Sequence, residues 1–309
     1  MDTLPTVTAL VVTWNGRELL IPCLESLAAQ TLPHQVVVVD NASTDGTSEM
    51  IRTRFPTVQV VQNRTNRGFA GGAEDGLRMV DTPFVALLNN DAVAEPTWLQ
   101  HLTEAMDRHP EAAAVTSRML LAGVTPPTMN NAGVVLLDDG YGADRGLGQD
   151  AGSFDEEAEV FGFSGGAALL RVAAVRSVGG FPAPFFLYYE DTDTSWRLRR
   201  AGWQVRYEPT AVVHHQHSAS SDQSSPSFAY WNERNRLLMH VRCAAAGRAV
   251  AVWLRFLVTT ASLAARRLVG GPPPPAHQQR VLLRARAFAG AVRLLPWALL
   301  SRRRPLSPR

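Results

Sequence analysis

The stretch VTALVVTWN at residues 7–15 decides the fold of this 309-residue chain. Its first seven residues form an apolar, β-branched run, which is typical of a strand buried on both faces of a parallel sheet. Leucines at helical spacing follow in residues 17–30, and the valines of residues 36–39 repeat the buried-strand pattern. The chain therefore opens with a predicted β-α-β unit.

The same alternation of strand and helix signals continues toward the C-terminus. Further helices are predicted at residues 47–55, 73–80, 191–201 and 228–245, and strands at 58–61, 84–88, 161–170, 204–207 and 211–214. This order predicts an α/β fold with a Rossmann-like, mostly parallel sheet and flanking helices. The weak periodicity of residues 120–159 predicts a long excursion with little regular structure, and such segments are often functional.

Charge divides the chain into two parts. Residues 242–309 hold 13 arginines and no Asp or Glu, whereas residues 1–241 hold 17 arginines against 28 acidic residues. We therefore predict one α/β domain over residues 1–241 and a basic, apolar, helical tail over residues 242–309. The acidic first part argues against a nucleic-acid partner, and the basic tail is compatible with an anionic lipid surface.

The tail itself is predicted to hold two helices on either side of a stiff proline-rich spacer at residues 270–275. The first segment, residues 249–265, carries an arginine near its centre, and the second, residues 281–300, carries three arginines and a proline. Buried charges oppose insertion into hydrocarbon, so both segments suit helices that lie on a membrane surface better than helices that cross it.

The cysteine pattern and the first residues indicate a cytoplasmic protein. Cys23 and Cys243 have no cysteine or histidine at metal-ligand spacing, which argues against a disulfide framework or a zinc site. Residues 1–6 lack the basic and apolar regions of a secretory signal. Together with the tail, these features predict a peripheral location on the inner face of the cell membrane.

Four polar blocks lie at or near predicted strand ends, where α/β sheets bind their ligands. They are VVTWN at 11–15, VDNASTDG at 39–46, NRGFAGG at 66–72 with LNND at 88–91, and YYEDTD at 188–193 with RLRRAG at 197–202. In this order the blocks closely resemble family 2 glycosyltransferases of the GT-A fold, and within them the bacterial rhamnosyltransferase-like members. The resemblance covers residues 7 to about 240.

The first blocks predict a nucleotide site. Asp40 ends a strand, so its carboxylate can accept hydrogen bonds from a uracil or thymine imide or from a ribose hydroxyl, and the resemblance implies this use. The alternative is that Asp40 only starts an Asx-type turn. Thr13 and Asn15 are predicted to line the same site. Asn66 and Gly68 belong to a glycine-rich segment that permits close approach of a ligand before a helix N-terminus, or that merely forms a loop.

The block after residues 84–88 stands where the resemblance places a metal motif. Asp91 is predicted to hold Mg²⁺ or Mn²⁺ together with the donor diphosphate, since such ions need only one or two carboxylates. Asn90 is predicted to contact the donor. His215, six residues after Pro209, matches the histidine that completes the metal site in the family. The alternatives are a helix-capping Asp91 and a purely structural His215.

The last block predicts the catalytic base. Asp191 precedes a helix whose free N–H groups favour an ionised carboxylate, as a general base requires, and by position it matches the base of the family. Glu190 and Arg234 are candidate contacts to acceptor or phosphate. The chain departs from its relatives at Glu74, where they often carry Asn, and at Pro182, where they usually carry Asp.

The resemblance implies an inverting, metal-dependent glycosyltransferase. Its donor would be a nucleoside-diphosphate sugar, with dTDP-rhamnose as the first choice, and its acceptor a hydroxyl of a cell-envelope glycan or polyprenyl-linked lipid. A UDP-hexose or galactofuranosyl transferase of the same fold is the alternative. A sugar-nucleotide pyrophosphorylase would need a basic, glycine-rich loop after the first strand, and a non-catalytic sugar-binding membrane protein would tolerate loss of Asp91 and Asp191. The chain lacks that loop and keeps both acids.

Overall fold

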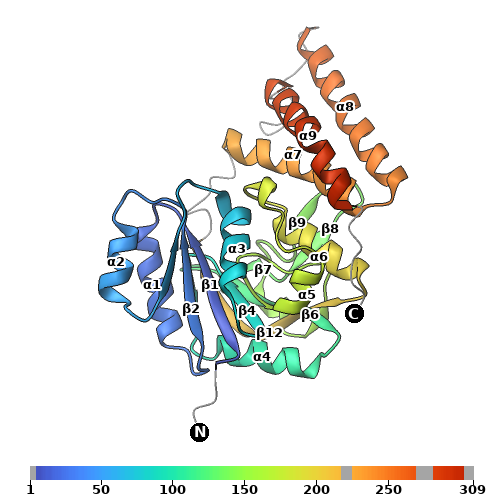
Figure 1. Ribbon diagram of the computed structural model, residues 1–309. Helices are drawn as coiled ribbons and strands as arrows, with labels where there is room; N and C mark the ends of the chain where they lie inside the picture. Colours follow the sequence, from blue (N-terminus) through green and yellow to red (C-terminus); the bar gives the residue numbers. More distant parts are fainter. Residues whose placement is uncertain (1–4, 217–224, 269–280, 303–309) are drawn as a thin grey trace. The chain divides into compact units, whose positions relative to one another are not determined.

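The computed structural model describes residues 5–216, 225–268 and 281–302 (Figure 1). The chain forms two compact units. Of the described residues, 5–135 and 143–216 form the sheet unit, and 136–142, 225–268 and 281–302 form the helical unit. The predicted boundary between residues 241 and 242 falls near the end of a helix that packs within the helical unit. The division of function between the two parts stays a prediction.

The elements predicted up to residue 88 alternate as expected, and the structure adds a helix at Trp98–Arg108 and a strand at Ala112–Leu121 that the sequence analysis did not predict. The strands are β1 (Val7–Thr13), β2 (Gln35–Asp40), β3 (Gln59–Gln62), β4 (Phe84–Leu88), β5 (Ala92–Ala94), β6 (Ala112–Leu121), β7 (Met129–Asn131), β8 (Val134–Leu136), β9 (Gly142–Asp144), β10 (Ala158–Glu159), β11 (Ala167–Arg171) and β12 (Gln204–His215). The helices are α1 (Arg17–Ala28), α2 (Thr47–Arg54), α3 (Gly68–Met79), α4 (Trp98–Arg108), α5 (Val172–Ser177), α6 (Glu190–Arg200), α7 (Pro226–Cys243), α8 (Ala246–Leu268) and α9 (Val281–Arg302), with short 3₁₀ turns at Ala151–Phe154 and Ala183–Phe185.

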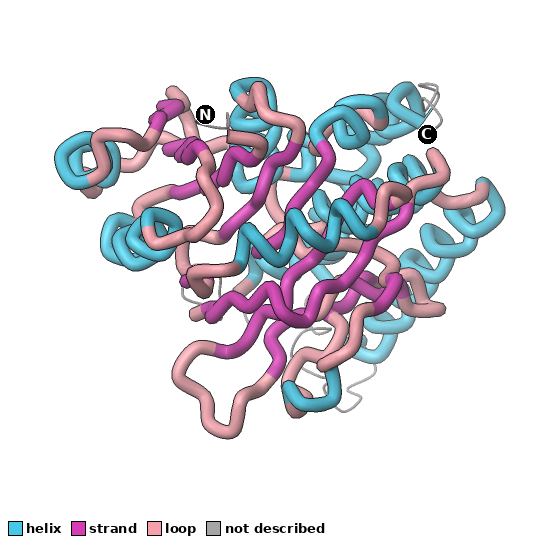
Figure 2. Tube along the Cα trace, turned by 90° about the horizontal axis from the view of Figure 1, so that it is seen from below, coloured by secondary structure: helices cyan, strands magenta, loops and turns pink. Residues whose placement is uncertain are grey.

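The central sheet has the strand order β10-β12-β6-β11-β4-β1-β2-β3. The strands β3, β2, β1 and β4 are parallel to one another, and β12 is parallel to β6. Only β11 among the longer strands runs the other way, because it pairs antiparallel with both β4 and β6. Figure 2 shows these strands side by side with helices over the sheet. The predicted α/β fold with a mostly parallel sheet and flanking helices is confirmed.

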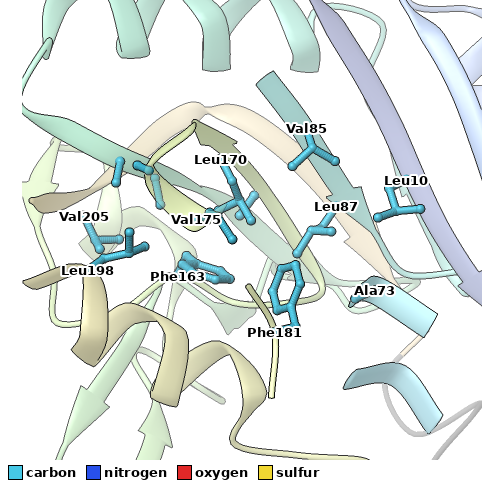
Figure 3. Close-up of a cluster of buried hydrophobic side chains, with 14 of the residues drawn as sticks. Leu10, Ala73, Val85, Leu87, Phe163, Leu170, Val175, Phe181, Leu198 and Val205 are labelled. Carbon is cyan, nitrogen blue, oxygen red and sulfur yellow. The ribbon is translucent and has the colours of Figure 1, made fainter. Parts of the chain in front are cut away.

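Helices cover both faces of the sheet. Successive residues of a strand point to opposite faces, and β1 divides accordingly. Leu10 joins a core with residues of α3, α5 and α6, which Figure 3 shows, whereas Val11 joins a second core with residues of α1 and α4. Burial on both sides accounts for the continuous apolar run of residues 7–13, since neither face of this strand meets water.

The structure changes three of the predicted boundaries. The helix predicted at 73–80 begins at Gly68, and the strand predicted at 161–170 begins only at Ala167, after a turn of small residues. The two strands predicted at 204–207 and 211–214 form one strand, β12, with an irregular register between Glu208 and Val212. The excursion of residues 120–159 contains only short strands and one 3₁₀ turn.

The helical unit is held by aromatic and buried polar contacts. The ring of Trp253 on α8 lies 5.5 Å from that of Phe288 on α9, and its Nε1 donates to the carbonyl oxygen of Leu237 on α7 at 3.1 Å. Arg284 of α9 donates to Thr260 Oγ1 of α8 at 2.9 Å. The predicted helical C-terminal region is therefore present, and the spacer predicted at residues 270–275 lies outside the described residues.

The loop before α3 depends on a residue without a side chain. Gly68 has φ +67°, and a Cβ added to it would lie 2.0 Å from the carbonyl oxygen of Phe186. The same oxygen accepts a hydrogen bond from the backbone N–H of Ala70 at 3.1 Å. The N-terminus of α3 and the segment before α6 therefore approach each other too closely for any larger residue.

We expect Gly68→Ala to lower the free energy of unfolding by about 2 kcal/mol or more, because backbone strain and a backbone clash add. The matched control is Gly148→Ala, which has φ +75° but no heavy atom within 4 Å of the added Cβ. Gly148→Ala should lower the free energy of unfolding by only about 1 kcal/mol, because it adds backbone strain without a clash. Urea unfolding of both variants measures the difference, and equal costs would show that the Phe186 contact does not form.

Candidate active site

The predicted site residues of the sheet unit gather at one edge of the sheet. The strands β1, β2, β4 and β12 run in the same direction, so their carboxyl ends meet there. Thr13 ends β1, Asp40 ends β2, and His215 ends β12. The antiparallel strand β11 begins at this edge, which brings the glycine turn before it to the same place.

Asp40 is enclosed at the end of β2. Its Oδ1 accepts from the backbone N–H of Ser43 at 2.9 Å, and its Oδ2 accepts from the hydroxyl of Ser48. The residue is 0% exposed. The Asx-type turn is thus present in the structure, and contact of Asp40 with a base or ribose stays a prediction that requires the following loop to move.

Asn15 joins the loops after β1 and β2. It has φ +48°, a left-handed conformation that Asn tolerates better than most residues. Its Oδ1 accepts from the backbone N–H of Thr44 at 2.8 Å, and its own N–H donates to Ser43 Oγ at 2.8 Å. In the next predicted block, Asn66 Oδ1 accepts from the N–H of Gly68 at 2.8 Å and shapes the turn into α3.

The block after β4 turns back toward the sheet. Asn90 Nδ2 donates to Thr13 Oγ1 at 3.1 Å, which links the ends of β4 and β1. The N–H of Asn89 donates to the carbonyl oxygen of Gly166 at 2.9 Å and links the turn to β11. Asp91 is consequently fixed at the edge of the sheet and is only 3% exposed.

Asp91 and His215 face each other across this edge. The Asp91 Oδ1 atom lies 3.0 Å from His215 Nε2, although 124 residues separate the two in the sequence. The other ring nitrogen, Nδ1, lies 3.0 Å from Asn130 Oδ1 of β7. An amide oxygen accepts hydrogen bonds, so Asn130 favours the tautomer with the ring proton on Nδ1, which leaves the lone pair of Nε2 facing Asp91.

Asp91 Oδ1 and His215 Nε2 are both placed as possible metal ligands. When the ring proton is on Nδ1, the lone pair of Nε2 faces the Asp91 carboxylate oxygen at 3.0 Å and the Asn89 amide Nδ2, a possible donor, at 3.2 Å. A divalent cation between the carboxylate and the ring would accept a lone pair from each. Adjacent ligands of an octahedral Mg²⁺ are about 3 Å apart when each bond is about 2.1 Å, so the observed separation fits such an ion.

The protein supplies few ligands of its own at this point. Among the described residues, no group of three or more His, Cys, Asp or Glu side chains is placed to hold a metal. Asp91 and His215 would therefore form only part of a coordination sphere, as in sites where substrate phosphates and water provide the remaining ligands.

Asp191 lies in the first turn of α6 with its carboxylate held by N–H groups. Its Oδ2 accepts from the N–H of Gly165 at 3.0 Å, and its Oδ1 accepts from the N–H of Thr192 at 2.6 Å. Burial raises the pKa of Asp191, and these hydrogen bonds oppose the shift. A carboxylate with a raised pKa, fixed in orientation, is suited to accept a proton.

Glu190, the neighbour of Asp191, is 6% exposed, and its Oε2 has no hydrogen-bond partner within the described residues. Burial and then the charge of Asp191 raise the pKa of Glu190 well above its usual range. Glu190 is therefore suited to hold a proton beside an ionised Asp191. Its predicted contact with acceptor or phosphate stays a prediction.

Arg234 belongs to the helical unit, on α7. Its guanidinium lies 4.3 Å from the ring centre of Trp231, and its Nε donates to Asn235 Oδ1 at 2.9 Å. Burial lowers the pKa of Arg234. These contacts give it a structural role within α7, and its predicted contact with acceptor or phosphate stays a prediction.

Sequence reasoning missed two polar groups of the site. Asn130 contacts the ring of His215, and Asp144 on β9 lies where the charge of Asp191 raises its pKa. Both lie in residues 120–159, which were expected to have little regular structure. The one signal in that segment was the pair Asn130 and Asn131 among apolar residues, and it does not specify a partner 85 residues away.

The strand order with the reversed β11 is that of the GT-A fold, as two solved structures show. GalNAc-T7, solved with UDP, GalNAc and Mn²⁺, superposes with a TM-score of 0.66 at 13% identity, over 99% of this chain and 59% of that chain. The mannosyltransferase PcManGT from Pyrobaculum calidifontis, solved with GDP-Man and Mn²⁺, superposes with a TM-score of 0.56 at 19% identity, over 96% of this chain and 88% of that chain.

The family follows from the sequence of the same region. Residues 8–179, more than half of the chain, match the model described as glycosyl transferase family 2. The chain belongs to this family and is a glycosyltransferase. It is 31% identical over 253 residues to the N-acetylglucosaminyl-diphospho-decaprenol L-rhamnosyltransferase of Mycobacterium tuberculosis, covering 72% of this chain and 80% of the relative. It is also 31% identical over 186 residues to the pre-mycofactocin glycosyltransferase of that organism, covering 59% of this chain and 37% of the relative.

We expect His215→Gln to weaken Mn²⁺ binding in the presence of a nucleoside diphosphate at least tenfold, because an aligned nitrogen ligand is lost. The matched control is His214→Gln. His214 is the preceding residue on β12, and its Nε2 lies 3.3 Å from Glu95 Oε1 rather than beside Asp91. The control should bind Mn²⁺ within twofold of wild type in titration calorimetry. Equal Mn²⁺ affinities for wild type, His215→Gln and His214→Gln would show that His215 is not a metal ligand.

Proposed function

We propose that this glycosyltransferase moves rhamnose from dTDP-rhamnose to a hydroxyl of a cell-envelope glycan or lipid-linked acceptor, with inversion at the anomeric carbon. The choice of sugar and acceptor rests on the similarity to the mycobacterial rhamnosyltransferase. The choice of mechanism rests on one observation, namely that Asp91 faces His215 at the edge where Asp191 is held by the glycine turn.

In the proposed reaction, Asp191 accepts the proton of the acceptor hydroxyl while its oxygen forms a bond to the anomeric carbon and the bond to the nucleoside diphosphate breaks. The N–H groups of Gly165 and Thr192 keep the carboxylate aimed throughout. Asp91 and His215 would hold Mg²⁺ or Mn²⁺, which supplies positive charge for the departing diphosphate. A single displacement of this kind inverts the anomeric configuration.

The nucleotide is proposed to bind over the ends of β1 and β2. Thr13 and Asn15 lie there, and Asn15 already ties the two loops together. Asp40 would reach a uracil or thymine imide once the loop from Ser43 to Ser48 releases its carboxylate. A UDP-hexose or UDP-galactofuranose donor remains the second candidate, because these polar groups would contact the nucleotide and do not select the sugar.

A donor screen tests the proposed reaction. Purified protein with Mg²⁺ or Mn²⁺, an N-acetylglucosamine diphospholipid acceptor and each donor should release nucleoside diphosphate at least tenfold faster from dTDP-rhamnose than from UDP-hexoses or UDP-galactofuranose. Asp191→Asn should keep donor affinity within twofold and lose at least about 100-fold in transfer, since general base catalysis contributes on that order. Faster turnover of another donor would show that rhamnose is not the transferred sugar. A loss of donor affinity as large as the loss of transfer in Asp191→Asn would place Asp191 in the donor site.

We further propose that the helical unit holds the enzyme on the cytoplasmic face of the membrane. One face of α8 packs within the unit through Val252 and Phe256, whereas its other face exposes apolar side chains. These are Val250, Leu254, Leu257 and Val258, exposed by between 41% and 69%. Because the segment from residue 242 carries 13 arginines and no acid, this face combines apolar burial with attraction to anionic headgroups.

Among the described residues, one segment, Ala246–Arg266 of α8, is long and apolar enough to cross a membrane, with a mean hydropathy of 1.3. Length and composition do not separate a span from a helix at the interface. The two-sided pattern of α8 favours the interface, since one face is taken up by α7 and α9 and the other carries Arg255 beside the apolar residues.

Flotation with vesicles tests this proposal. The full-length protein should float with anionic vesicles at low salt and much less with neutral ones. Leu254→Gln combined with Val258→Gln should weaken binding at least tenfold, because each apolar side chain contributes about 1.5 kcal/mol or more when buried. Met79→Gln is the control, at an apolar residue of α3 that is 44% exposed, and it should not change binding. Absence of flotation would contradict the proposal, and resistance to both high salt and carbonate would indicate a span.

A further inference from the structure

We infer that Asp144 is a further substrate-binding residue, which accepts hydrogen bonds from hydroxyl groups of the acceptor sugar beside the one that reacts. This inference rests on the proposed function, because it assigns the acceptor side of the same site. Asp144 ends β9 and is exposed, in contrast to the other carboxylates of the site.

The Asp144 side chain is fixed by a buried amide. Asn131 Nδ2 donates to Asp144 Oδ1 at 2.6 Å, and Asn131 Oδ1 in turn accepts from the N–H of Gly133 at 2.6 Å. Asn131 is 3% exposed, so its orientation is set by the protein. Within the described residues, Asn131 is the one donor to the Asp144 carboxylate, and Oδ2 is left open to accept from a ligand.

Backbone contacts place this carboxylate on the same side of the sheet as the proposed base. Val134, next to Gly133, exchanges backbone hydrogen bonds with Gly162. The chain then passes over α6, where Phe163 N–H donates to Ser195 Oγ and Gly165 N–H donates to Asp191 Oδ2. Asp191 and Ser195 lie one turn apart on α6. The segment of residues 162–165 therefore contacts both the proposed base, Asp191, and Val134 near Asp144.

The charge of Asp144 agrees with this placement. Although Asp144 is exposed as a residue, the protein around its carboxylate removes part of its water, and this desolvation and then the negative charge of Asp191 raise the pKa of Asp144 to about 6. At neutral pH Asp144 is nevertheless ionised and able only to accept hydrogen bonds. Sugar hydroxyls are donors, and a carboxylate accepts from two neighbouring hydroxyls at once.

The acceptor is favoured over the donor as the ligand of Asp144. The proposed nucleotide residues lie at the ends of β1 and β2, whereas β7, which carries Asn131, pairs with β6 on the far side of β4 and β11. Asp144 is thus separated from the nucleotide side by the strands that carry Asp91 and the glycine turn. Only the reacting hydroxyl needs to meet Asp191, and the adjacent hydroxyls of the same sugar are available to Asp144.

Steady-state kinetics of Asp144→Asn test the inference. The variant keeps the size and the Asn131 hydrogen bond but loses the charge. We expect kcat/KM for the acceptor to fall at least tenfold, mainly through KM, while the KM for donor and the rate of donor hydrolysis by water stay within twofold. The matched control is Asp138→Asn, an exposed carboxylate in the turn between β8 and β9, which should change none of these values.

Acceptor analogues that lack one hydroxyl next to the reacting position give a second measurement. With one of these analogues, kcat/KM of the wild-type enzyme should fall by the same factor as kcat/KM of Asp144→Asn falls with the full acceptor. The kcat/KM of Asp144→Asn should not fall further with that analogue. An acceptor kcat/KM within twofold of wild type, or a parallel loss of donor hydrolysis, would overturn the assignment of Asp144. Absence of transfer by wild type with every donor would instead overturn the proposed function, and this inference with it.

Discussion

The contact between Asp91 and His215 depends on the whole sheet. Asp91 follows β4 and His215 ends β12, and β11 and β6 lie between these two strands. The two side chains meet because β5, directly after Asp91, pairs antiparallel with the end of β12, with His215 opposite Ala92. A buried carboxylate costs free energy unless a positive charge or hydrogen bonds compensate it. The pairing of β5 with β12 therefore sets the position of both proposed metal ligands.

The irregularity in β12 decides which way His215 points. Between Glu208 and Val212 the strand gains three residues relative to β6. An odd insertion moves side chains to the opposite face of a sheet, and the cores show this change. Val205 belongs to the core beneath α3, α5 and α6, whereas Val213 belongs to the core beneath α1 and α4. Pro209 lies in the insertion, where its missing N–H does not interrupt the ladder.

The sequence predicted those features that local patterns determine. The parallel half of the sheet follows from alternating strand and helix signals, and Thr13, Asp40 and Asp91 stand at or just after predicted strands, whose carboxyl ends meet at one edge. His215 was assigned from the resemblance, by its spacing from Pro209. The hydrogen-bonded turn at Asp40 was the alternative interpretation of its block, and the structure contains it.

Long-range pairing explains what the sequence did not predict. The break between residues 207 and 211 was visible, but the change of face across it depends on the register against β6. Asn130 and Asp144 lie in short strands without periodicity, and their roles come from partners elsewhere in the chain. The exposed face of α8 likewise appears only once α7 and α9 cover the other face.

The central claim is a single displacement in which Asp191 activates the acceptor at an edge organised by Asp91 and His215. The most direct test is the anomeric configuration of the new glycosidic bond, measured by NMR of the purified product. We expect this bond to have the configuration opposite to that of the nucleotide-sugar donor. A product that retains the donor configuration would contradict it, because retention requires a second displacement or a different attacking face.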